Sequence, residues 1–143
     1  MTGNDGITES YRRLALNYAF AVDRRDGAAL AACFAPDGEL AGTRMVRTGD
    51  QIAEIPAIHA KTYVRVRHEV VNQSCTPLPD GRFKGETYCN ASHLFHPEIE
   101  ANTILVMAIR YEDDLVRVGD GLRFARRRLH LDWQEKRSVL PPG

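Results

Sequence analysis

Residues 63–73, YVRVRHEVVNQ, decide the fold, because apolar and charged side chains alternate along them. Successive side chains of a β-strand point to opposite faces of the sheet, so the alternation predicts a strand with one buried face. The buried row consists of Val64, Val66, His68 and Val70. A histidine in the middle of an apolar row suggests that this face lines a pocket rather than a closed core.

The residues before this strand have a helical pattern, and those after it an extended one. Apolar residues recur at spacings of three and four over 7–24, which predicts a helix. Asp26 is a candidate N-cap for a second helix over 27–34, and a third over 48–60 is interrupted by Pro56. A turn is predicted at 35–40. The predicted strands are 39–46, 63–75, 83–95, 101–112 and 122–134.

Helices first and strands later predict an α+β fold, in which helices pack on one face of a curved antiparallel sheet. Long strands joined by hairpins can curl into a cone with a pocket inside. The 143 residues fit a single domain over 1–143, with flexible tails at 1–5 and 137–143.

The overall composition is that of an ordinary soluble protein. Lys plus Arg and Asp plus Glu both total 19, so no net charge favours nucleic acid or an anionic membrane. No stretch approaches the roughly 20 apolar residues of a membrane span, and the N-terminus does not read as a secretory signal. Cys33, Cys75 and Cys89 are widely spaced and form no CxxC pair. These features predict a cytoplasmic protein with reduced thiols.

Asp23 and His68 form the main candidate site. Asp23 extends the apolar side of the first helix, although a carboxylate is disfavoured near a helix C-terminus. If the Asp23 carboxylate accepts one ring N–H of His68, the other ring nitrogen can take a proton from a substrate. The alternatives are an aspartate that is solvated or bonded to a neighbouring arginine or loop amide, and a core histidine bonded to a backbone carbonyl.

His93 lies on the predicted inner face of the next strand and is a third catalytic candidate, as a general acid or hydrogen-bond donor. An inward arginine, Arg126 or Arg128, could meet a polar substrate group, unless the arginine run is a solvated edge. The candidate substrate contacts are Tyr18, Phe20, Val66, Cys89, Leu105, Met107, Phe124 and Arg126.

A bound metal or cofactor is not predicted. His93 and His96 are three apart on a strand, so they face opposite sides and cannot easily share an ion. Glycine-rich phosphate loops and nucleophile elbows are absent from the sequence.

Residues 14–40, LALNYAFAVDRRDGAALAACFAPDGEL, resemble the opening of SnoaL-like domains of the nuclear-transport-factor-two-like superfamily. The resemblance continues through HEVVNQ at 68–73, GRFKGETYCNASHLFH at 81–96, and YEDDLVR and GDGLRFARRRL at 111–129. It implies a cystatin-like α+β barrel that pairs or forms trimers. The positions of Asp23 and His68 match the catalytic pair of scytalone dehydratase and hexachlorocyclohexane dehydrochlorinase. The position of His93 matches the second active-site histidine of scytalone dehydratase.

The resemblance implies a cofactor-independent lyase that eliminates water or a related group from a small hydrophobic, cyclic or aromatic substrate. His68 would remove the proton, Asp23 would orient His68, and His93 would assist the departure of hydroxide. Two alternatives remain open on this fold. One is a polyketide-cyclase-type or isomerase-type enzyme that uses the same pair of residues, and the other is a non-catalytic module that binds a small molecule or a partner.

Overall fold

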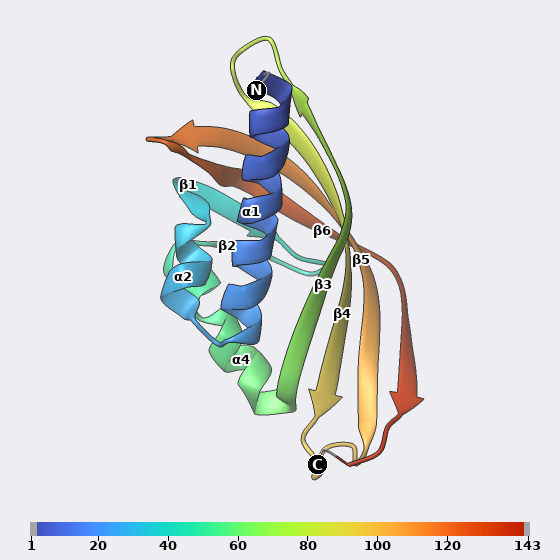
Figure 1. Ribbon diagram of the computed structural model, residues 1–143. Coiled ribbons are helices and arrows are strands. Elements are labelled where there is room, and N and C mark those ends of the chain that lie inside the picture. Colours follow the sequence, from blue (N-terminus) through green and yellow to red (C-terminus); the bar gives the residue numbers. More distant parts are fainter. Residues whose placement is uncertain (1–2, 142–143) are drawn as a thin grey trace.

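The computed structural model describes residues 3–141, with side chains from residue 6 onward. Four helices precede the long strands within this range (Figure 1). In chain order the elements are α1 (Gly3–Asp23), α2 (Gly27–Ala32), β1 (Phe34–Ala41), β2 (Val46–Thr48), α3 (Asp50–Ala53), α4 (Ile55–Thr62), β3 (Tyr63–Pro77), β4 (Phe83–Phe95), β5 (Thr103–Val118) and β6 (Gly121–Ser138).

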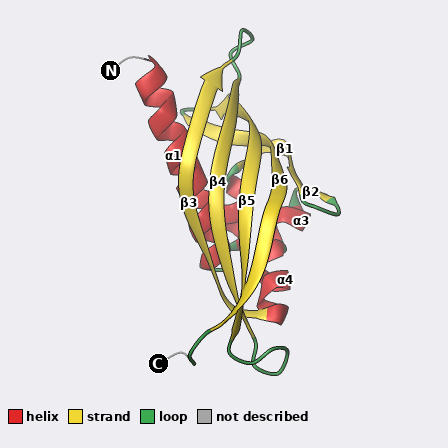
Figure 2. Ribbon diagram, turned by 90° about the vertical axis from the view of Figure 1, so that its right-hand side faces the viewer, coloured by secondary structure: helices red, strands yellow, loops and turns green. Residues whose placement is uncertain are grey.

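The strands of residues 3–141 form one six-stranded sheet in the order β2-β1-β6-β5-β4-β3. The sheet curves around the helices, which lie on one of its faces (Figures 1 and 2). The α+β prediction is confirmed, with two corrections to the sheet. It is mixed rather than antiparallel throughout, because β1 runs parallel to β6. It is also open, because β2 and β3 form separate edges.

Helix α1 packs through the apolar stripe that the sequence predicted. Each residue of the stripe is at most 5% exposed. The stripe consists of Ile7, Tyr11, Leu14, Tyr18 and Val22. Just after the helix, Arg25 adopts a left-handed φ of 58°. Its guanidinium donates to the backbone carbonyls of Tyr63 and Val64 at 2.9 and 2.7 Å, which fixes the end of α1 against the start of β3.

The short elements follow local rules. Asp26 caps α2 as predicted, since its Oδ1 accepts from the Ala29 amide at 3.0 Å. Pro56 lies in the first turn of α4, where a missing N–H costs nothing, and the break before it separates α3 from α4. The predicted turn at 35–40 is instead an irregular part of β1, whose register with β6 shifts between Phe34 and Glu39.

The predicted tails overlap regular structure. Residues 3–5 belong to α1, and Arg137 and Ser138 belong to β6. Residues 1–2 and 142–143 lie outside the described residues, so the structure does not test that part of the prediction. None of the helices in 3–141 combines the length and the apolar character that crossing a membrane requires.

Candidate functional site

A cavity of about 410 Å³ lies between the helices and the inner face of the sheet. Its volume is within the usual range for small-molecule sites. Most of its wall is apolar, and His59, His68 and His93 interrupt that wall. The lining residues are Tyr18, Val22, Leu40, Gly42, Thr43, Arg44, Met45, Arg47, Ile55, Ile58, His59, Tyr63, His68, His93, Met107, Ile109, Tyr111, Leu129 and Leu131.

The structure brings Asp23 and His68 together. Oδ1 of Asp23 lies 2.8 Å from Nδ1 of His68, and Oδ2 accepts the backbone N–H of His68 at 2.9 Å. The side chains of His68 and Asp23 are 6% and 20% exposed, so solvent competes little for the contact between the His68 ring and the Asp23 carboxylate. Asp23 thus holds both the backbone and the ring of His68 from the end of α1.

This contact fixes the chemistry of the His68 ring. An ionised carboxylate can only accept hydrogen bonds, so Nδ1 of His68 carries the hydrogen. In the neutral ring Nε2 then has the free lone pair. Because His68 lines the cavity and its Nδ1 is occupied by Asp23, Nε2 is the nitrogen available to a bound molecule.

His93 is held in a similar way from the neighbouring strand. Its Nδ1 lies 3.1 Å from the carbonyl oxygen of Leu105, so Nδ1 donates and Nε2 keeps the lone pair. The His93 and His68 ring centroids are 6.2 Å apart. Burial lowers the pKa of His93, and the nearby His68 ring lowers it further. At neutral pH, therefore, His93 presents a hydrogen-bond acceptor rather than an acid.

His59 is a cavity residue that the sequence did not single out. It lies on α4, four residues after Ile55, on the side of the helix that lines the cavity. Its ring centroid is 6.1 Å from that of His93, and its buried Nδ1 has no hydrogen-bond partner in the described part of the chain. Burial lowers the pKa of His59 to about 4, helped by the charges of its neighbours. The helical spacing from Ile55 could have indicated its direction.

The lowered pKa values predict that acid destabilises the fold. A histidine in the unfolded chain has a pKa near 6.5, so the unfolded state takes up protons first as the pH falls. The stability is therefore lost between about pH 6.5 and the pKa of about 4 for folded His59. Replacing His59 with leucine should remove about 2–3 kcal/mol of the loss at pH 4, as measured by urea unfolding at a series of pH values. Parallel stability curves for the two proteins would contradict this.

The floor of the cavity rests on a buried cation. Arg127 is 1% exposed, and its guanidinium carbon lies 3.6 Å from the ring centroid of Tyr111 and 4.3 Å from that of Tyr18. Its Nε lies 3.1 Å from Oδ1 of Asp113. Tyr18 lines the cavity as predicted, and burial raises its pKa, so its hydroxyl stays protonated at neutral pH.

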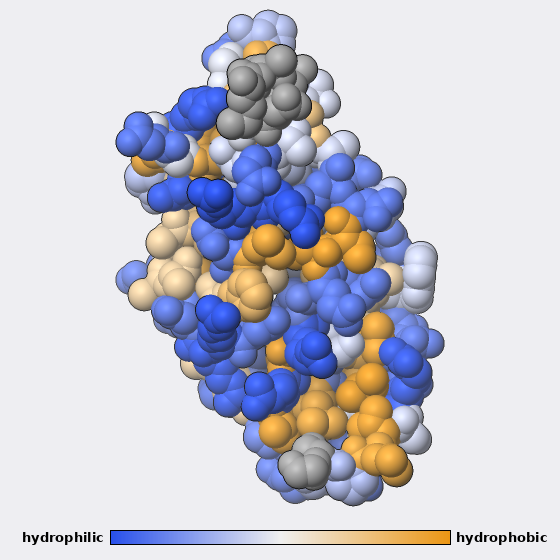
Figure 3. Space-filling view, viewed as in Figure 1, coloured by the Kyte–Doolittle hydropathy of each residue, from blue (hydrophilic) through white to orange (hydrophobic). Residues whose placement is uncertain are grey.

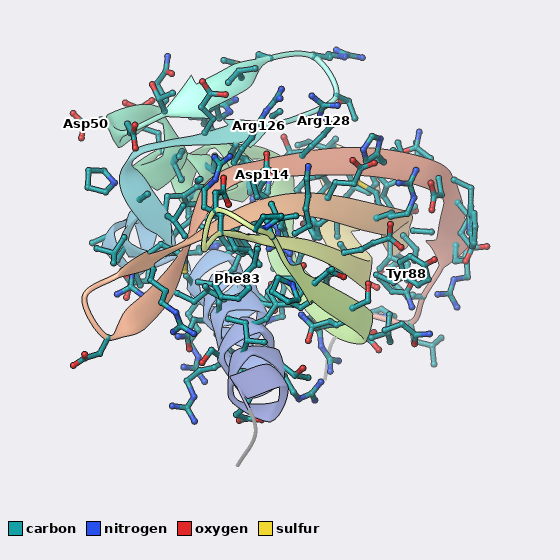
Figure 4. All side chains as sticks on the ribbon, turned by 90° about the horizontal axis from the view of Figure 1, so that it is seen from above. Asp50, Phe83, Tyr88, Asp114, Arg126 and Arg128 are labelled. Atoms are coloured by element: carbon teal, nitrogen blue, oxygen red, sulfur yellow. The ribbon has the colours of Figure 1, made fainter. Side chains whose placement is uncertain are left out.

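The prediction of an inward Arg126 or Arg128 was wrong, because strand β6 contains a bulge. Asp114 pairs with Arg126 but Leu115 pairs with Phe124, so Ala125 is an extra residue. One extra residue reverses which side chains face the cavity. Arg127, Leu129 and Leu131 therefore point inward. Arg126 and Arg128 lie with Asp114 in a separate charged cluster, away from α1 (Figure 4).

Several other predicted substrate contacts lie elsewhere. Met107 lines the cavity, whereas the side chain of Leu105 does not, and Leu105 contributes through the carbonyl that orients His93. Val66, Cys89 and Phe124 are core residues, at most 6% exposed. Burial raises the pKa of Cys89 to about 12, so it packs as a neutral thiol.

Phe20 and Val64 point away from the core. Phe20 is 49% exposed on the far side of α1, where the Arg24 guanidinium lies 4.3 Å from its ring. Val64 is 41% exposed, because the register of β3 shifts between Tyr63 and Arg65 and brings Tyr63 to the cavity instead. Exposed apolar groups on the face in Figure 3 form patches separated by polar side chains.

Solved structures with the same fold include a dehydratase candidate, a dehydrochlorinase and the protein ActVI-ORFA. A candidate scytalone dehydratase from Novosphingobium aromaticivorans is 20% identical, with a TM-score of 0.80 over 100% of this chain and 98% of its own. A type 2 hexachlorocyclohexane dehydrochlorinase is 15% identical, with a TM-score of 0.84 over 96% and 95%. ActVI-ORFA from Streptomyces coelicolor is 21% identical, with a TM-score of 0.74 over 89% and 98%. At these sequence identities, the structural similarity shows that this chain has the same fold as the three proteins.

The search of curated proteins gave no match to this chain. The sequence model of the SnoaL-like domain, by contrast, matches residues 8–128, which include most of α1, the cavity residues of β3–β5 and the bulge of β6. The resemblance noted in the sequence is thereby confirmed, and the chain belongs to the SnoaL-like domain family.

Proposed function

We propose that the protein is a cofactor-independent lyase that eliminates water from a small hydrophobic β-hydroxy carbonyl compound. The observation that carries this proposal is the 2.8 Å contact between Asp23 and Nδ1 of His68, which leaves Nε2 as a base at the cavity. The apolar wall suits a cyclic or aromatic substrate body. The dehydratase and dehydrochlorinase names among the structural neighbours agree with an elimination.

In the proposed reaction, His68 alone takes up the proton and returns it to the leaving group. Nε2 of His68 takes the proton from the carbon next to the carbonyl, and the electron pair left behind forms the carbon–carbon double bond. The hydroxyl leaves from the adjacent carbon and takes the proton back from His68, so that water is released and the base is restored. The Asp23 carboxylate stabilises the imidazolium between these two transfers.

His93 and Tyr18 have positioning roles in this scheme. The lone pair on Nε2 of His93 can accept a hydrogen bond from the substrate hydroxyl, which holds the leaving group beside His68. This role differs from the acid role implied by the family resemblance, because burial keeps His93 neutral. The Tyr18 hydroxyl, supported by the Arg127 cation, can donate to the carbonyl oxygen as negative charge develops there.

The test is an incubation of the purified protein with a panel of hydrophobic cyclic β-hydroxy ketones and β-hydroxy acids. We expect loss of one water by mass spectrometry and growth of the conjugated chromophore, both absent with the variant His68→Gln. A product with the mass of the substrate would indicate an isomerase. Release of water together with ring closure would indicate a cyclase. Saturable binding without turnover across the panel would overturn the lyase proposal in favour of a binding module.

A further inference from the structure

Two arginines line the mouth of the cavity. Arg44 lies in the loop between β1 and β2, and Arg47 lies in β2 itself. Ile58 and His59 of α4 line the same cavity. Arg44 is exposed and Arg47 is half-buried, so the two cations stand between solvent and the apolar interior.

The guanidinium groups of these arginines have no hydrogen-bond or ion-pair partner among residues 6–141. Some other arginines of the protein are engaged: Arg25 donates to two backbone carbonyls, and Arg127 pairs with Asp113. An arginine fork without a carboxylate partner is suited to bind one from outside, because its geometry matches carboxylate oxygens in pairs.

The remaining charges around the cavity leave these cations uncompensated. The described lining residues include no aspartate and no glutamate, although the chain as a whole is neutral. Asp23 is already engaged by the ring and the backbone of His68. The charge of Arg47, which lines the same cavity as His59, also contributes to the lowered pKa of His59. The mouth of the cavity is therefore positive.

We propose that the substrate carries a carboxylate, which Arg44 and Arg47 bind at the mouth while the hydrophobic body enters the cavity toward His68. This inference rests on the proposed function for its choice of site and narrows the substrate class to a hydrophobic carboxylic acid. The apolar residues Met45, Ile55 and Ile58 next to the arginines would contact the body of such a molecule. The same cations would favour the entry of anionic molecules over neutral ones of equal shape.

The experiment compares 2-naphthoate with the neutral 2-naphthamide by isothermal titration calorimetry. Both have the same aromatic body, so the difference in Kd reports the charge. We expect the wild type to bind naphthoate about 5- to 10-fold more tightly than the amide, a preference that shrinks as salt is added. Arg47→Gln should reduce the preference to within about twofold, and Arg44→Gln should reduce it in the same direction. Shifts of the His59 and His93 ring signals by NMR would locate both ligands in the cavity.

The matched control is Arg12→Gln, which removes the same charge from an exposed position on α1. It should keep the full preference for naphthoate. Equal binding of the two ligands by the wild type, no binding of either at millimolar concentration, or an equal loss of preference in Arg12→Gln and Arg47→Gln would overturn the inference. Because naphthoate undergoes no elimination, this outcome is independent of the dehydration assay. If the wild type prefers naphthoate but dehydrates no compound of the panel, the lyase proposal is wrong and the carboxylate site stands.

Discussion

Replacing His68 with glutamine is expected to lower kcat/KM for dehydration about 10²- to 10⁴-fold, the usual contribution of a general base. Glutamine retains a polar group of similar size, but it cannot take a proton at neutral pH. Its amide can still face Asp23, so the fold should be preserved. The measurement is steady-state kinetics on the best substrate of the panel, together with thermal unfolding to show that the variant is folded.

Asp23→Asn tests the same pair from the other side. An asparagine can turn its amide nitrogen toward Nδ1 of His68, which then becomes an acceptor, and the hydrogen moves to Nε2. The base is thereby blocked without being removed, and we expect a loss of activity comparable to that of His68→Gln. The ¹⁵N chemical shifts of the His68 ring should show the change from the Nδ1–H to the Nε2–H tautomer.

The control for both variants is His130→Gln. His130 lies on β6 outside the cavity, with its Nε2 2.9 Å from Oε1 of Glu112. It should keep wild-type kinetics. If His68→Gln or Asp23→Asn were folded and equally active, the pair would be structural and the proposed chemistry would be wrong.

The pairing of Asp23 with His68 could be foreseen because both residues interrupt a regular pattern. An aspartate on the apolar side of a helix and a histidine in an apolar strand row are each exceptions to a rule of burial. The β4 inner face was predictable for the same reason: its alternation is unbroken from Thr87 to Phe95, and every second residue there is buried.

Other parts of the site are marked in the sequence only weakly, as His59 is by its spacing from Ile55, or not at all. No glycine marks the bulge at Ala125 in the sequence. Simple alternation therefore assigned Arg127 to the wrong face of the sheet and left Leu129 and Leu131 outside the cavity. His59 lies on a helix, where a polar residue is expected to face solvent. Arg44 and Arg47 reach the cavity from the hairpin of β1 and β2, and the pairing of β1 with the distant strand β6 places that hairpin in the sheet.

Replacing Asp113 with alanine is expected to lower the free energy of unfolding by about 3–5 kcal/mol. Asp113 lies on β5 with no exposed side-chain area and accepts from Nε of Arg127 at 3.1 Å and from the Tyr11 hydroxyl at 2.5 Å. Removing the carboxylate leaves the Arg127 cation buried without an anionic partner, and it also removes one of the two hydrogen bonds that join α1 to the sheet at Tyr11, the other being donated by Thr87. Urea unfolding followed by circular dichroism measures the loss.

Asp114 is the matched control, since it is the next residue of the same strand and faces the other side. It is 39% exposed and pairs with Lys84 at 2.8 Å, so Asp114→Ala should cost no more than about 1 kcal/mol. The double variant Asp113→Leu with Arg127→Met removes both charges, and it should be more stable than Asp113→Ala because no buried cation is left without its anion. If Asp113→Ala proved too unstable to purify, the double variant alone would still decide the point. A folded, stable double variant would show that the unpaired charge causes the loss of stability in Asp113→Ala. An equally unfolded double variant would show that the loss comes from the missing packing of the Arg127 side chain against Tyr18 and Tyr111.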